Sequence, residues 1–248
     1  MSSSKLFLFL FLAVGVGALS STVSASSITL EIIPGYQMGY GGEFLATPDA
    51  DLFYVLDSYS PKAKLNNGFF TFCLERVARV TFEKPHNAVV NDVVVGLGGH
   101  TGGVNGVDAL SNGTAWLYQQ FATGTLEGYD YTAGHRSTAG KLQTAIWWLE
   151  GEVFLARPKK NPFVRLAINH FNGKVSSRAD NDGSFGVQVL NLGKSPQSSI
   201  QDMLVYSGPE STGSPVPDGG HTLLLLSTSL LTLALVQRKA HLASLPRV

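Results

Sequence analysis

The sequence contains one cysteine, Cys73, among its 248 residues. A single thiol excludes an intramolecular disulfide. Proteins that leave the cytoplasm normally pair their cysteines, so an unpaired one in such a protein needs a separate explanation. It is a buried apolar group, a partner for another chain, or a reactive group. Which of these three roles applies depends on whether the protein is exported and on which sequence motifs occur together with Cys73.

Charge is also scarce. Asp, Glu, Lys and Arg make up 15% of the chain, with 18 basic and 18 acidic residues and a pI near 7.0. This balance gives no electrostatic reason to expect a nucleic-acid partner. No internal repeat is visible. The 27 glycines and the many aromatic and β-branched residues favour a strand-rich extracytoplasmic domain over a helical bundle.

The first 25 residues have the pattern of a secretory signal peptide. Lys5 precedes the apolar run Leu6–Val16, and small residues stand at Val23 and Ala25. Such residues suit signal peptidase, which we expect to cut between Ala25 and Ser26. The apolar run is shorter than the roughly 20 residues that span a bilayer, although an uncleaved anchor is the alternative.

Residues 216–239 carry a second membrane-directed pattern. A short motif precedes an apolar stretch over residues 222–236, and Arg238 and Lys239 follow it. Basic residues after an apolar helix favour a cytoplasmic position, which makes residues 240–248 a cytoplasmic tail. The motif consists of Val216, Pro217, Asp218, Gly219 and Gly220.

This C-terminal segment resembles the PEP-CTERM sorting signals, in the variant with a VPDGG motif. The resemblance implies an exosortase as processing partner and delivery from the membrane to the cell surface or extracellular matrix. The tail of residues 240–248 is longer than the few basic residues that usually close such signals.

Between the two ends, residues 26–206 are expected to form one domain, joined to the membrane segment by a linker over residues 207–215. We predict an α+β fold, mainly antiparallel β-sheet with two or three inserted helices, flanked by the signal peptide and a C-terminal transmembrane helix. Residues 35–68 look irregular, and residues 96–106 are expected to be a loop. The predicted strands are Ser27–Ile33, Phe69–Leu74, Val77–Phe82, Val89–Leu97, Phe185–Leu192 and Asp202–Tyr206.

Three helices are predicted from apolar spacing and end signals. The first covers Thr114–Phe121. The second begins at a cap on Ser137 or Thr138 and stops at Gly151. The third begins at Asn161 with proline at its first position and ends at Gly173.

Two local patterns point to chemistry: Phe72-Cys73-Leu74 on a predicted strand and Leu142-Gln143-Thr144-Ala145-Ile146 on a predicted helix. Together they resemble the paired motifs of thioester domains on Gram-positive surface adhesins. The TQxA pattern of that family matches at Gln143 and Ala145, whereas Leu142 replaces the usual threonine. The resemblance implies that Cys73 supplies the sulfur and Gln143 the acyl group of an internal thioester.

Such a bond forms when the thiolate attacks the side-chain amide and ammonia leaves. A target amine or hydroxyl group would then take the acyl group and free the thiol. The reaction happens once per molecule, so the protein would be an adhesion or matrix protein without a cofactor rather than a turnover enzyme. The bond would also close a loop of 70 residues (143 − 73). By analogy with a disulfide, that closure stabilises the fold by about 4 kcal/mol, so a purely structural thioester is an alternative.

Other functions stay open. The first is a non-covalent binding or structural protein with a buried free cysteine. The second is a hydrolase-like pair between Cys73 and His100, His135 or His170. Residues 180–184 resemble the start of a calcium loop but lack its final acidic residue, which favours a polar turn. The last alternative is a sugar-stacking face made of Trp116, Tyr118, Trp147 and Trp148.

Overall fold

The computed structural model describes residues 26–37, 41–95, 107–132, 134–193 and 199–208. The signal peptide and the sorting segment lie outside these ranges, as do His100 and the glycine-rich loop. Among the residues that are described, no helix is both long and apolar enough to cross a membrane.

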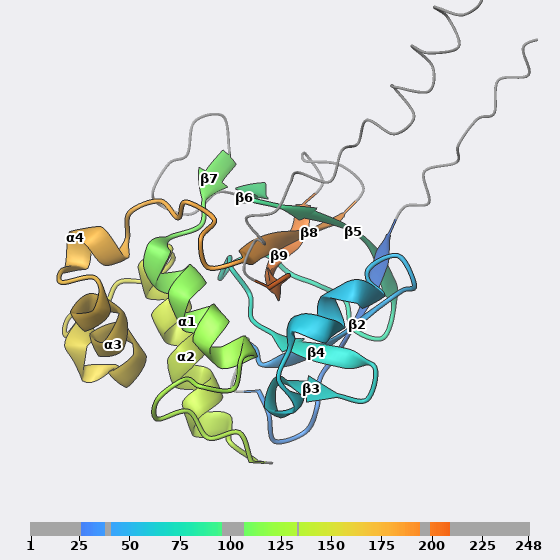
Figure 1. The fold of residues 1–248 in the computed structure, drawn as a ribbon, viewed down its shortest axis with the longest axis horizontal. Helices are drawn as coiled ribbons and strands as arrows, with labels where there is room; N and C mark the ends of the chain where they lie inside the picture. Colours follow the sequence, from blue (N-terminus) through green and yellow to red (C-terminus); the bar gives the residue numbers. More distant parts are fainter. Residues whose placement is uncertain (1–25, 38–40, 96–106, 133, 194–198, 209–248) are drawn as a thin grey trace, which may run out of the picture.

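The described chain is an α+β domain built on an antiparallel seven-stranded sheet in the order β3-β4-β2-β1-β5-β8-β9, with β6 and β7 as a separate pair. Helices α1, α2 and α3 gather to one side of the strands (Figure 1). The strands are β1 (Ser27–Glu31), β2 (Phe44–Pro48), β3 (Lys64–Leu65), β4 (Gly68–Thr71), β5 (Pro85–Asn91), β6 (Val93–Val95), β7 (Val107–Ala109), β8 (Val187–Gly193) and β9 (Ser199–Tyr206). The helices are α1 (Asn112–Ala122), α2 (Arg136–Leu149), α3 (Pro162–His170) and α4 (Lys174–Ser177), with 3-10 turns η1 (Phe53–Ser58), η2 (Pro61–Ala63) and η4 (Pro158–Lys160). This confirms the predicted fold class of the domain.

Strand β4 is buried on both faces. Its residues alternate in direction, as in any strand, so Phe69 and Phe70 point to opposite sides. The Phe69 ring stacks on Tyr59 with centroids 4.8 Å apart, and the Phe70 ring stacks on Tyr36 at 5.1 Å. Apolar side chains are therefore favoured on both faces, which explains the adjacent Phe69 and Phe70, whereas the buried Thr71 hydroxyl donates to the carbonyl of Leu204.

The residues that follow β4 close the sheet on itself. The N–H of Leu204, on β9, donates to the carbonyl of Phe72 at 3.2 Å, and the N–H of Leu74 donates to the carbonyl of Asp202 at 2.9 Å. Cys73 pairs with Met203 between these two bonds. Because β9 is the far edge strand of the same sheet, this pairing satisfies its free polar groups. Cys73 thus lies at the seam where the two ends of the sheet meet.

The helix ends follow local sequence signals in two of three cases. The Ser111 hydroxyl accepts the N–H of Thr114 at the start of α1, and Asn161 caps α3 ahead of Pro162, as predicted. The second predicted helix is present as α2, but its predicted cap is wrong, because the N-cap is His135 rather than Ser137 or Thr138. The His135 side chain is fixed by tertiary contacts, so the helix begins earlier than its own sequence indicates.

Three strand predictions need correction. Val77–Phe82 is not a strand: Val77 is exposed, and Phe82 packs its ring against Phe44 from irregular backbone. Residues 35–68 are not irregular throughout, since β2 forms there between β1 and β4. The predicted strand Val89–Leu97 is interrupted at Asp92, which separates β5 from β6. Pairing with β1 and β4, which are distant in the chain, is what makes β2 a strand.

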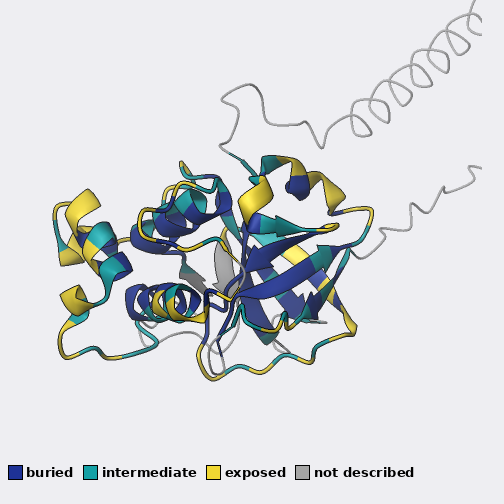
Figure 2. Cartoon of the chain, turned by 90° about the horizontal axis from the view of Figure 1, so that it is seen from below, coloured by how far each residue is buried: buried dark blue, intermediate teal, exposed yellow. Residues whose placement is uncertain are grey.

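One hydrophobic core lies between the helices and the sheet. Leu117, Phe121, Leu142 and Ile146 come from the inner faces of α1 and α2 and are fully buried. Figure 2 shows the same pattern, with the strands largely buried and exposed residues concentrated on the loops, the outer surface of the helices and the α3–α4 end. The two helices are therefore held firmly against the strands that carry Cys73.

Candidate functional site

The side chain of Gln143 lies against the backbone of Cys73. Its Nε2 donates to the carbonyl oxygen of Cys73 at 2.8 Å, and its Oε1 accepts the N–H of Cys73 at 3.0 Å. The same Oε1 also accepts the N–H of Gly42 at 2.9 Å. The two residues that the paired motifs single out are thus in contact, although 70 positions separate them.

Burial explains how Gln143 reaches this position. It belongs to the inner face of α2, where its neighbours Leu142 and Ile146 are completely buried. Gln143 is 1% exposed and Cys73 is 4% exposed. A buried carboxamide needs hydrogen-bond partners, and the backbone of residue 73 and the N–H of Gly42 provide them. Sequence spacing alone does not reveal this, because a glutamine on a helix is usually exposed.

Besides Gln143 and Cys73, the site includes two glycines, Gly41 and Gly42. A Cβ on Gly41 would lie 2.5 Å from Cγ of Gln143 and 2.9 Å from Cη2 of Trp147. A Cβ on Gly42 would lie 2.8 Å from the carbonyl oxygen of Thr71. Only glycine allows so close an approach of backbone to side chain. The Gly-Gly pair is the signal in the sequence that would have indicated this part of the site.

The surroundings of Cys73 disfavour a free thiolate. Burial raises the pKa of its thiol, the nearby carboxylate of Glu75 raises it further, and the N–H of Gly42 partly offsets both. The thiol therefore stays protonated at neutral pH and needs a proton acceptor to react as a nucleophile. The same N–H of Gly42 that lowers the pKa of the thiol also donates to Oε1 of Gln143 at 2.9 Å.

Glu75 and Asp202 form a buried acidic pair next to Cys73. Oε2 of Glu75 accepts the N–H of Asp202 and Nε2 of Gln201, both at 2.8 Å. Oε1 of Glu75 is buried without a hydrogen-bond partner. Burial and the neighbouring Asp202 raise the pKa of Glu75 to about 8. Sequence analysis did not identify this pair, because the two residues are distant in the chain.

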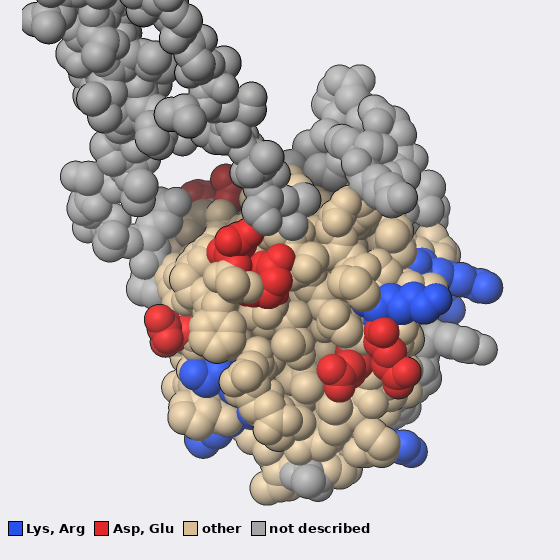
Figure 3. All heavy atoms as spheres, turned by 90° about the vertical axis from the view of Figure 1, so that its right-hand side faces the viewer, with Lys and Arg blue, Asp and Glu red and all other residues tan. Residues whose placement is uncertain are grey.

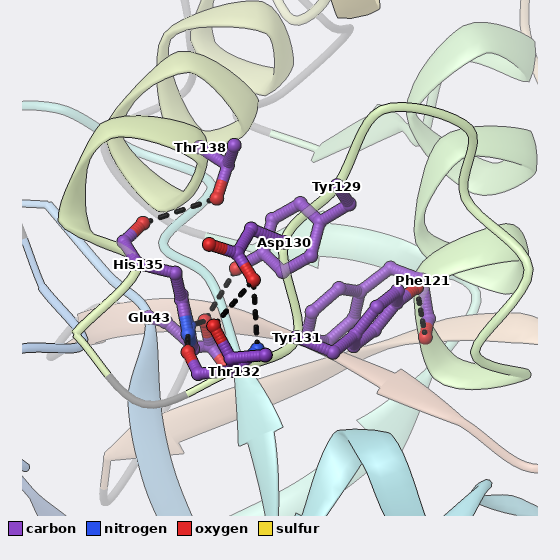
Figure 4. A network of polar contacts seen from close by, with 8 residues as sticks. All are labelled: Glu43, Phe121, Tyr129, Asp130, Tyr131, Thr132, His135 and Thr138. Atoms are coloured by element: carbon purple, nitrogen blue, oxygen red, sulfur yellow. Dashed lines mark hydrogen bonds and ion pairs between the residues drawn. The ribbon is translucent and has the colours of Figure 1, made fainter.

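A second buried network fixes the start of α2 near the site (Figure 4). Oε2 of Glu43 lies 2.6 Å from Nε2 of His135 and accepts the Tyr129 hydroxyl, and Nδ1 of His135 contacts the Thr132 carbonyl. Burial raises the pKa of Glu43, partly offset by His135. Burial also lowers the pKa of His135, but the Glu43 carboxylate outweighs it and the net pKa is raised. Since Glu43 follows Gly42 directly, this network holds the glycine pair in place relative to α2.

The histidines and aromatic residues that the sequence suggested as alternative sites lie in environments different from that of Cys73. His135 pairs with Glu43, and the His170 ring stacks on Trp116 at 4.2 Å, so these histidines are engaged elsewhere than at Cys73. Tyr118 and Trp148 are buried in the core and do not join an exposed sugar-stacking face.

Residues 180–184 form a polar turn, in which Oδ1 of Asp182 accepts the N–H of Ser184 at 3.0 Å. Within the described part of the chain, no three His, Cys, Asp or Glu side chains gather as a metal site. On the face that Figure 3 shows, acidic and basic side chains both occur and most of the surface is uncharged. Neither the polar turn nor the distribution of surface charge indicates a second reactive site.

Comparison of the chain with protein-family models, with curated proteins and with solved structures found no match. The candidate function therefore rests on the geometry of Cys73, Gln143 and the groups around them.

Proposed function

We propose that the protein is an exported surface or matrix protein in which Cys73 and Gln143 form an internal thioester. The bond would later acylate an amine or hydroxyl group on a target and attach the protein covalently. One observation carries the proposal: the Gln143 carboxamide lies on the backbone of Cys73, with its oxygen accepting two backbone N–H groups.

Those two donors suit the chemistry of bond formation. When sulfur adds to Cδ of Gln143, negative charge develops on Oε1, which faces the N–H groups of Gly42 and Cys73. Fixed donors aimed at a developing oxyanion lower the barrier, typically by several kcal/mol. The hydrogen bond from Nε2 to the Cys73 carbonyl holds the amide in one orientation, so little entropy is lost in reaching the transition state.

The burial of the site fits a stored acyl group. Water is excluded from Cys73 and Gln143, which protects a thioester from hydrolysis. Gly41 and Trp147 pack on the Gln143 side chain, so a target amine would have to displace them first. The amine would then form an amide with the Gln143 acyl group, and Cys73 would leave as a thiol.

The proposal includes the route out of the cell. Signal peptidase would cut between Ala25 and Ser26. The apolar segment over residues 222–236 would stop in the membrane at Arg238 and Lys239, and an exosortase would then process the motif at residues 216–220. The protein would be membrane-anchored before that step and displayed on the surface or in the matrix afterwards.

Intact-mass spectrometry of the purified protein tests the thioester. We expect a deficit of one ammonia relative to the sequence, and methylamine should add its own mass to the bonded form. Cys73→Ala and Gln143→Glu should both lack the deficit. A freshly prepared wild-type protein with full mass and a free thiol would refute the proposal.

A non-covalent binding or structural protein is the second candidate. The raised pKa and burial of the Cys73 thiol favour it, because both suit an inert core side chain. This function predicts one titratable thiol after unfolding, no reaction with methylamine, and target binding that survives in Cys73→Ala.

A further inference from the structure

We infer that Glu75 is the proton acceptor for thioester formation and that Asp202 sets the pH range in which it can act. The inference rests on the proposed thioester and names the group that makes its formation possible. The site requires a proton acceptor, because a buried thiol does not ionise without one.

The geometry places Glu75 beside the reacting cysteine. It stands two residues after Cys73, on the segment that pairs with β9, and its charge acts on the Cys73 thiol. One carboxylate oxygen is fixed by the N–H of Asp202 and the amide of Gln201. The other, Oε1, is buried with no hydrogen-bond partner, and the side chain is 3% exposed. A buried acceptor with an open position is suited to take a proton.

The pair also holds a proton of its own. Glu75 and Asp202 are both buried and close enough to hydrogen-bond, and the described donors to Oε2 of Glu75 are amide and backbone N–H groups. Two adjacent carboxylates repel each other when both are ionised, so the two groups titrate as a pair. Such a pair costs folding free energy, and a role in chemistry accounts for its presence.

With Glu75 as the proton carrier, the atoms and charges of the reaction balance. The Cys73 proton passes to the Glu75 carboxylate while sulfur bonds to Cδ of Gln143, which gives a tetrahedral intermediate with its oxygen on the Gly42 and Cys73 N–H groups. The C–N bond breaks, Nε2 takes the proton back from Glu75, and ammonia leaves. The products are the thioester, ammonia and Glu75 in its starting state. Transfer to Glu75 also neutralises the charge that opposes the thiolate.

The charged groups around Glu75 set its pH dependence. Asp202 acts from β9 and raises its pKa, and Cys73 acts from the same segment. Arg76 follows Glu75 in the chain but is exposed, and its N–H donates to Glu152 at the end of α2. The pKa of Glu75 is raised to about 8, so the ionised acceptor increases as the pH rises through that value.

Refolding kinetics test the inference on the full chain. The protein is purified unfolded, with thiol and amide intact, then refolded while mass spectrometry follows the loss of ammonia. In the native sequence we expect the rate to rise with pH and to level off above about pH 8. Glu75→Gln keeps the shape but cannot accept the proton, and should slow formation about a hundredfold. Asp202→Asn is the matched control: it removes the neighbouring charge, so the rate should level off at a lower pH.

The outcomes separate the inference from the proposed function. If the native chain never loses ammonia, the thioester proposal fails and the inference with it. If the native chain and Glu75→Gln form the bond at the same rate, the thioester stands and the role of Glu75 is refuted. Should Glu75→Gln not fold, the native profile decides: a rate that rises tenfold per pH unit through about pH 10, without a plateau, is that of direct thiol ionisation and also refutes the role.

Discussion

Gln143 hydrogen-bonds to both backbone polar groups of Cys73, accepting its N–H at 3.0 Å and donating to its carbonyl at 2.8 Å. Strand β4 leaves β2 after Thr71, which pairs with Phe44, so residue 73 has no partner strand on that side. The Gln143 carboxamide replaces that strand with one donor and one acceptor. Cys73 and Gln143 are thus held together by bonds that the backbone requires in any case.

Removal of the Gln143 carboxamide should destabilise the fold beyond the loss of the cross-link. Gln143→Ala leaves the N–H groups of Gly42 and Cys73 and the Cys73 carbonyl buried without partners, each at a cost of about 1–3 kcal/mol. Cys73→Ala also lacks the thioester but keeps those bonds. We expect the free energy of unfolding of Gln143→Ala to be lower than that of Cys73→Ala by about 3 kcal/mol or more, measured in urea. Equal stabilities would contradict the hydrogen-bonding role.

Gly41→Ala should prevent thioester formation although Cys73 and Gln143 themselves are unchanged. Its methyl group would lie 2.5 Å from Cγ of Gln143, so the carboxamide must shift. We expect destabilisation of about 1–3 kcal/mol and no loss of ammonia by mass spectrometry. Gly173→Ala is the matched control, because the nearest atom to its added methyl is 3.8 Å away. Ammonia loss in Gly41→Ala equal to that in the control would show that the glycine is not required.

The Glu43–His135 pair should make stability depend on pH. The folded-state pKa of His135 is raised above the ordinary 6.5, so its contribution is fully present below that pH and is lost as the pH rises through the folded value. The raised pKa of Glu43 acts in the same direction, from its ordinary 4.5 upward. Urea unfolding across this range should give a free energy that falls with pH in the native protein and falls less steeply in His135→Gln. Parallel curves for the two proteins would contradict the assignment.

Tyr118→Phe should weaken the core and leave the thioester site intact. The Tyr118 hydroxyl bonds to the carbonyls of Phe70 and Leu204, at 2.9 and 3.1 Å, so it ties β4 to β9 through α1. Its loss leaves these buried groups with fewer partners, at a cost of about 1–3 kcal/mol. Tyr54→Phe, at an exposed position, should change stability by less than about 0.5 kcal/mol. Both variants should show the same mass deficit as the native protein. If Tyr118→Phe unfolds at the same urea concentration as Tyr54→Phe, its hydroxyl does not hold the strands together.

Local sequence was enough to predict several elements, and two local motifs indicated Cys73 and Gln143 as a candidate pair. Strand β1, helices α1 and α3 and the Asn161 cap all depend on residues that are close together in the chain, and each was confirmed. The pairing of Cys73 with Gln143 was predicted from two motifs, and the structure brings the side chain of one onto the backbone of the other.

Tertiary structure alone decided the rest. The closure of the sheet at Cys73, the approach of Gly41 and Gly42, the Glu75–Asp202 pair and the His135 cap all join segments far apart in the sequence. Contacts of this kind depend on which surfaces are buried against each other, and no periodicity or spacing within one segment encodes that choice. The sequence therefore determined which two residues are candidates, whereas packing decided which groups surround Cys73 and Gln143.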